Sequence, residues 1–139
     1  MQTLEEEVNK PKHYRTHESG IEAIEITRHL PADLSNAWKY AMRYQDKGTP
    51  KKDLKKLVWY MNDYLEHFID DNNEITVKFE VPSEVKLAML TVQAAEPEAA
   101  IAELFNQIIG IVISQGIGNP CKMKQTLSAV NELSESFSN

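Results

Sequence analysis

Residues 36–65, NAWKYAMRYQDKGTPKKDLKKLVWYMNDYL, contain two helical patterns that are separated by one short turn. Gly48 is suited to end the first helix, Thr49 to cap the second, and Pro50 to occupy its first position, where a missing N–H costs nothing. Apolar residues then recur at spacings of three and four, which is typical of a helix with one buried face. They are Leu54, Leu57, Val58, Met61, Leu65 and Phe68. The sequence therefore predicts two helices that face each other across the turn.

The composition predicts a globular protein, because 42% of the 139 residues are hydrophobic and 26% are charged. This length suits one domain, or a small domain with an appendage. The longest apolar run, IIGIVI at 108–113, is too short to span a bilayer, and the acidic start has no secretory h-region. The single cysteine, Cys121, excludes an internal disulfide and favours a reducing compartment. We therefore expect a cytoplasmic protein without a membrane partner.

The pattern changes after the turn at 70–73, DDNN, which we interpret as a boundary between two segments. Residues 75–81, ITVKFEV, alternate strictly and predict a strand. That strand must pair with residues 85–92 or with its own copy in a second subunit, so 85–92 could be strand or helix. Residues 97–115 predict a helix that is apolar on most sides, as at an oligomer interface.

The expected fold is therefore mostly α, with an α+β character. Residues 1–73 form a helical domain in this interpretation, and residues 74–139 form a strand-and-helix segment that mediates self-association. We accordingly expect a homo-oligomer.

Positive charge is concentrated in one part of an otherwise acidic chain. The net charge of −6 argues against a general nucleic-acid-binding protein. Seven of the fifteen Lys and Arg residues fall between positions 39 and 56: Lys39, Arg43, Lys47, Lys51, Lys52, Lys55 and Lys56. Such a local basic zone suits a small anion, for example a nucleotide phosphate. The alternative for the last four lysines is a solvated helix face.

Several catalytic motifs are missing from the sequence. It contains no GxxxxGK[ST] phosphate loop, no GxSxG, no HExxH and no paired CxxC. Glu22 and Glu25 lie one helical turn apart, and together with Asp70 and Asp71 they could hold a magnesium ion. The same carboxylates could instead cap a helix or be solvated, so the metal requirement stays open.

A polar stripe on the first helix of the pair is the better candidate site. Asn36, Lys39, Tyr40, Arg43 and Lys47 are spaced at three, four and seven residues, on one face of that helix. An arginine and a lysine one turn apart can clamp a phosphate. The phenol can stack on a base, and the amide can read the base edge. The alternative is an exposed polar face with the phenol at the rim of the core.

Four blocks in residues 9–69 resemble a phage-encoded family that includes the small nucleotide kinases of the T-odd coliphages and SaV-like proteins. The blocks are NKPKHY, GIEAIEI, NAWKYAMRYQDK and DLKKLVWYMNDYL. The residues that carry the resemblance are Pro11, His13, Tyr14, Ile21, Glu22, Ile24, Glu25, Asn36, Lys39, Tyr40, Arg43, Lys47, Asp53, Leu54, Lys55, Trp59 and Tyr60. Residues 74–139 lie outside it.

The resemblance implies that residues 1–73 form a nucleotide-handling domain. It implies a deoxynucleoside monophosphate kinase without a P-loop, which takes a phosphoryl group from a nucleoside triphosphate in the cytoplasm of an infected host cell. Lys39 and Arg43 would then be catalytic. The implied nucleotide-binding residues are His13, Tyr14, Glu22, Glu25, Asn36, Lys39, Tyr40, Arg43, Lys47, Lys55 and Trp59. The magnesium requirement is not implied either way.

Two alternatives stay open at this point. A non-catalytic phage protein that sequesters nucleotides, or the cyclic nucleotide signals of host defence, would need the same clamp. A protein that inhibits a host enzyme could use the lysine zone as its docking surface.

Overall fold

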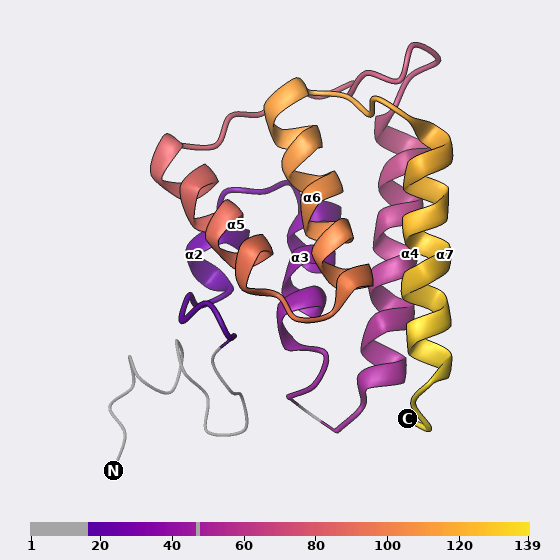
Figure 1. The fold of residues 1–139 in the computed structure, drawn as a ribbon. Helices are drawn as coiled ribbons and strands as arrows, with labels where there is room; N and C mark the ends of the chain where they lie inside the picture. The colour runs from indigo at the N-terminus through magenta and orange to yellow at the C-terminus, as the bar shows by residue number, and fades with distance from the viewer. Residues whose placement is uncertain (1–16, 47) are drawn as a thin grey trace.

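Helices account for most of residues 17–46 and 48–139, the part of the chain that the computed structural model describes. Figure 1 shows how these helices pack around one another. In chain order they are α2 (Ile24–Thr27), α3 (Ala32–Arg43), α4 (Pro50–Phe68), α5 (Ser83–Ala95), α6 (Ala99–Ser114) and α7 (Pro120–Glu135). The expectation of a mostly helical protein is confirmed.

The turn between α3 and α4 forms as the sequence predicts, with one difference at the cap. Gly48 has φ +77°, a backbone conformation that glycine adopts without steric cost. Pro50 occupies the first position of α4, but the side chain of Thr49 makes no capping hydrogen bond. The apolar stripe of α4 is buried at Leu54, Leu57 and Met61. Helix α4 therefore buries the face that its spacing identified, and it packs against α3.

Residues on both sides of position 73 share one hydrophobic core. Trp38 of α3 is fully buried, and its ring lies 4.4 Å from that of Phe105 of α6. Helix α7 packs along α4, and α5 and α6 pack against α2 and α3 respectively (Figure 1). The helices of the expected self-association segment thus complete the core of residues 17–46 and 48–73.

The strand expected at residues 75–81 does not form. Two isolated bridges, Ile69 with Ile75 and Glu74 with Gly116, are the only β-pairing in this region of the described chain. The alternation reflects burial of Ile75 and Val81, while Val77 is 62% exposed. The N–H groups of this segment use other partners: that of Ile75 donates to the Gln115 carbonyl and that of Phe79 to the Gln115 side-chain oxygen, both at 3.0 Å. The segment is an irregular connection from α4 to α5.

Gly116 allows this connection to lie close to the end of α6. A Cβ atom at Gly116 would lie 2.7 Å from the carbonyl oxygen of Asn73, which is too close for any other residue without a backbone shift. The same carbonyl accepts a hydrogen bond from the Ile117 N–H at 2.7 Å. The turn after α4 is thereby fixed to the chain that follows α6.

The remaining helix predictions have mixed outcomes. Residues 85–92 are helical and belong to α5, which settles the open alternative, and the predicted apolar helix at 97–115 is α6. Between Gly20 and Leu30 the helix is only the single turn α2. Gly20 has φ +79°, which takes the chain out of helical geometry before Ile24. At the other end, the His29 and Leu30 N–H groups bond to carbonyls three residues earlier, which closes the turn. Among the described residues, no helix is both long and apolar enough to cross a membrane.

Candidate functional site

Helices α3 and α4 together present a surface of cations and aromatic rings. The Lys39 and Lys56 ammonium groups lie 4.9 Å and 5.6 Å from the centre of the Tyr40 ring. The Tyr40 and Tyr60 rings are stacked, with centroids 6.1 Å apart and planes 15° apart. Trp59 meets Tyr60 edge to face at 5.2 Å and is 61% exposed. We call these five residues the cation–aromatic face.

The amphipathic pattern of α4 explains why this surface forms. Lys56, Trp59 and Tyr60 are separated by three and four residues, so they share one side of the helix. The opposite side is buried, with Leu57 and Met61 fully inaccessible. Burying the apolar side necessarily turns the aromatic and basic side outward, next to the polar stripe of α3. The spacing grouped Lys39 and Tyr40 on one helix, and the structure brings Trp59 of α4 to the same surface through Tyr60.

Two other predicted residues of the stripe lie on α3 beside this face. Asn36 donates from its side-chain amide to the Ala32 carbonyl at 3.0 Å and accepts from the Lys39 ammonium at 3.2 Å. The amide predicted to read a base edge is therefore already hydrogen-bonded. Arg43 is the last residue of α3 and is half-buried. It lies three residues after Tyr40 and four after Lys39, so it extends the same stripe by one turn.

The lysine zone is divided between two sides of α4, and Lys55 does not lie at the predicted site. Its ammonium donates to Asn131 at 2.6 Å and to Glu135 at 2.5 Å, both on α7. Lys51 is 3.2 Å from the other oxygen of Glu135. Hydrogen bonding to Lys55, followed by that to Lys51, lowers the pKa of the Glu135 carboxyl. Residues 51 and 55 lie on the side of α4 that faces α7. Their lysines therefore attach α7 to α4.

The other side of α4 keeps its positive charge for the cation–aromatic face. Within the described residues, no carboxylate lies within 4.0 Å of the Lys52 or Lys56 ammonium groups.

Three of the predicted site residues, His13, Tyr14 and Lys47, lie outside the described residues.

The described carboxylates do not form the suggested magnesium site. The Glu25 carboxylate accepts a hydrogen bond from the Glu22 N–H at 2.8 Å, just before α2 begins. Asp70 accepts from the N–H groups of Asn72 and Glu74 and holds the turn after α4. Among the described residues, no three His, Cys, Asp or Glu side chains are grouped so as to hold a metal ion.

Sequence reasoning missed an acidic cluster at the other end of the α3–α4 pair. It joins Asp33, in the first turn of α3, to Asp63 of α4, and His67 lies 3.5 Å from Asp63. Burial raises the pKa of Asp33 to about 6, the Asp63 carboxyl adds to the rise, and His67 opposes it. Burial, with a smaller effect of Asp33, raises the pKa of Tyr64 to about 12. The spacing of Trp59, Asp63 and His67, four residues each, is the signal that places this cluster on the side of the cation–aromatic face.

This cluster predicts a pH dependence of stability. Because the pKa of Asp33 is about 6 in the folded protein and 3.8 ordinarily, the folded chain binds this proton more tightly than the unfolded chain. Its contribution to stability is complete below pH 3.8 and is lost as the pH rises to about 6. The unfolding free energy of Asp33→Asn minus that of the native protein should therefore be about 1–2 kcal/mol larger at pH 7 than at pH 4. Urea denaturation at both pH values measures the difference.

Exposed Asp71 provides the control for this comparison, since it lies in the turn after α4. Asp71→Asn should leave the pH profile of the native chain unchanged. Parallel profiles for the native protein and Asp33→Asn would show that Asp33 is not destabilised by its surroundings.

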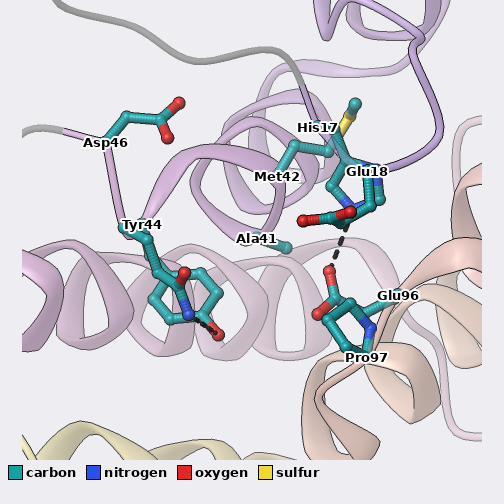
Figure 2. Close-up of a pocket in the computed structure, with 9 residues that line it drawn as sticks. His17, Glu18, Ala41, Met42, Tyr44, Asp46, Glu96 and Pro97 are labelled. Carbon is teal, nitrogen blue, oxygen red and sulfur yellow. Dashed lines mark hydrogen bonds and ion pairs between the residues drawn. The ribbon is translucent and has the colours of Figure 1, made fainter.

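A second polar site closes the other end of α3 (Figure 2). A pocket of about 110 Å³ lies between the residues before α2, the end of α3 and the turn from α5 to α6. In it His17 and Glu96 are joined, Nε2 to Oε1, at 2.9 Å, and their side chains are only 5% and 6% exposed. The His17 Nδ1 atom accepts from the Ser19 N–H, and the second Glu96 oxygen accepts from the Glu98 N–H.

The polar atoms of this buried pair are therefore already satisfied. Nearby, burial raises the pKa of Tyr44 to about 12, and the phenol oxygen accepts from the Gln45 side chain at 3.0 Å. The His17–Glu96 pair connects the chain before α2 to the α5–α6 turn, which is a structural role. The cation–aromatic face is consequently the stronger candidate for ligand binding.

Comparison with known proteins gives one match. Residues 8–62 are similar to a family described as a protein of unknown function, DUF3310. No curated protein matches the chain, and no solved structure does. The description of the family names no activity, so the resemblance to the phage nucleotide kinases stays a prediction.

Proposed function

We propose that the protein binds a deoxynucleoside monophosphate on the cation–aromatic face and transfers to this nucleotide the terminal phosphoryl group of a nucleoside triphosphate. The observation that carries the binding step is the pairing of ammonium groups with an exposed aromatic surface. Lys39 and Lys56 lie beside Tyr40, and Tyr60 and Trp59 continue the surface. A nucleotide needs both elements, a flat apolar surface for the base and positive charge for the phosphate.

The charge distribution supports a small ligand rather than a long nucleic acid. The chain has a net charge of −6, so the field around most of the molecule repels a polyanion. The cations on this side of α4 are Lys52 and Lys56, without a described carboxylate within ion-pairing distance. A phosphate placed there would gain charge-assisted hydrogen bonds, which are stronger than neutral ones.

The phosphoryl-transfer step follows from the resemblance in residues 9–69 together with the same charges. Negative charge on the transferred group and on its bridging oxygens must be offset during transfer, which cations can do without a covalent intermediate. Lys39 and Arg43 are one turn apart on α3 and would supply this charge. The donor is a nucleoside triphosphate, and the products are the two diphosphates.

One experiment with two readouts tests binding and turnover separately. The protein is incubated with each deoxynucleoside monophosphate and ATP or dATP, and both diphosphate formation and calorimetric binding are followed. The matching nucleoside, which lacks the phosphate, is the ligand control and should bind more weakly. Product formation supports the kinase activity. Binding without product would replace it with the sequestering function, and no binding of any mononucleotide would refute the proposal.

The stacking part of the proposal predicts a defined loss for Trp59→Ala. Stacking of a base on an aromatic side chain contributes about 1–3 kcal/mol, so we expect the mononucleotide affinity to fall by that amount in calorimetry. The protein should remain folded, because Trp59 is 61% exposed. Val77→Ala removes an exposed apolar side chain of similar exposure and should leave the affinity unchanged. Equal affinities for Trp59→Ala and the native protein would exclude this tryptophan from the site.

A further inference from the structure

The end of α7 places one carboxylate between two lysines of α4. The Glu135 Oε1 atom accepts a hydrogen bond from the Lys55 ammonium at 2.5 Å, and the Oε2 atom lies 3.2 Å from the Lys51 ammonium. Each carboxylate oxygen thus meets a different cation, which is how two lysines would hold two oxygens of a phosphate. Figure 1 shows α7 ending beside the start of α4. Glu135 is therefore an anion of the chain itself in a position suited to a phosphate.

This carboxylate can leave the two lysines without unfolding the helix that carries it. The side chains of Lys51, Lys55 and Glu135 are 36%, 40% and 54% exposed, and an exposed ion pair contributes little to stability. Helix α7 is anchored in the core by other residues, among them Met123 and Val130. A ligand with a higher negative charge can therefore take the two lysines from Glu135.

The two lysines lie close to the surface proposed for the mononucleotide. Lys55 is four residues before Trp59 and three residues after Lys52, so the three residues share one side of α4. A group that binds at Lys55 is thus one helical turn from the cation–aromatic face. A phosphoryl donor must place its terminal phosphate at such a short distance from the acceptor, because transfer requires the reacting atoms to be in near contact.

We infer that Lys51 and Lys55 bind the phosphate chain of the donor nucleoside triphosphate, and that Glu135 occupies this site in the free protein. The inference rests on the proposed function, since phosphoryl transfer requires a second nucleotide beside the monophosphate. The phosphate chain of a triphosphate carries more negative charge than a monophosphate, so it needs cations beyond those of the cation–aromatic face. Lys51 and Lys55 are the neighbouring pair that already holds an anion.

Glu135 competes with phosphate as an ionised group. Its hydrogen bonds with Lys55 and then Lys51 lower the pKa of the carboxyl, so it is negatively charged at neutral pH. Glutamine has nearly the same shape but no charge. Glu135→Gln therefore removes the competing anion and leaves the size of the side chain unchanged.

The test is the binding of ATP, and of inorganic tripolyphosphate, which has no base, to the full chain in calorimetry. Glu135→Gln should bind both probes at least about 10-fold more tightly than the native chain, the effect of one hydrogen bond to a charged group. Adding Lys55→Gln to this variant should abolish the gain, because one of the two lysines is then lost. A gain that persists without Lys55 would overturn the inference.

Glu132→Gln is the matched control. Glu132 is exposed on the same helix, three residues before Glu135, and it forms no ion pair with another described residue. Its replacement removes the same charge and should leave both affinities unchanged. Circular dichroism checks the helix content of each variant. If Glu135→Gln does not fold, Lys55→Gln alone decides, because it should weaken the binding of both probes, whereas Lys124→Gln at an exposed position of α7 should not.

The proposed function and this inference fail in different ways. Absence of mononucleotide binding to the native protein would refute the proposed function. Equal affinities of the native chain and Glu135→Gln for tripolyphosphate would overturn the inference, whatever the result with mononucleotides. The mononucleotide affinity itself should be the same in both proteins, because Glu135 holds Lys51 and Lys55, which are not part of the cation–aromatic face.

Discussion

Replacing Phe105 with alanine should lower the free energy of unfolding by about 3–5 kcal/mol, the usual cost of removing a buried aromatic side chain. Phe105 is fully buried, and its ring contacts that of Trp38 at a centroid distance of 4.4 Å. The substitution would leave a cavity between α3 and α6, where the two halves of the chain meet. Urea denaturation followed by tryptophan fluorescence measures the loss.

The matched control for this prediction is Leu87→Ala, which removes a side chain that is 65% exposed and should change stability by less than about 0.5 kcal/mol. A second comparison uses Trp38→Ala. Because the two rings contact each other, the double variant should lose less stability than the sum of the single variants. Additive losses would show that α3 and α6 do not depend on this contact. A loss below about 1 kcal/mol for Phe105→Ala would contradict the packing described for the core.

Replacing Arg43 with alanine should lower the mononucleotide affinity by about 1.5–3 kcal/mol, the contribution of a hydrogen bond to a charged group. This corresponds to about a 10- to 150-fold rise in the dissociation constant. If Arg43 also offsets charge during phosphoryl transfer, the rate of diphosphate formation should fall further than the affinity does. Calorimetry gives the first quantity, and single-turnover product formation gives the second.

Two variants separate the role of this arginine from a general effect of charge. Arg43→Lys keeps the charge but loses the planar pair of donors, so it should recover only part of the affinity. Lys124→Ala removes an exposed cation from α7 and should have no effect on binding. Unchanged affinity in Arg43→Ala would remove this residue from the site, while the aromatic part of the proposal would still be tested by Trp59→Ala.

The helices could be predicted from sequence because each has a local pattern that packing then satisfied. The three-and-four spacing of α4 identified Leu54, Leu57 and Met61, and all three are buried. At 75–81 the sequence pattern does not distinguish a strand from an irregular segment. Its alternation also describes an irregular segment that buries Ile75 and Val81, and the partner of the Phe79 N–H is a side chain 36 residues away.

The candidate site was predictable only where its residues share a helix. Lys39, Tyr40 and Arg43 could be grouped by spacing, but the direction of Lys55 depends on α7, whose position the sequence does not give. The acidic cluster was missed for the same reason, since Asp33 and Asp63 are distant in sequence and meet only when α3 packs on α4. Residue spacing gives the side of a helix, whereas the neighbour on that side is decided by tertiary structure.

The core shared between Trp38 and Phe105 also has a consequence during protein synthesis. At about 5–20 residues per second, roughly 3–13 seconds pass between the addition of these two residues by the ribosome. Once residue 68 has been added, the growing chain contains α3 and α4 but not α6, so Trp38 lacks its contact with Phe105. The nascent protein is therefore expected to depend on chaperones until translation has passed α6, although its first helical pair is already complete.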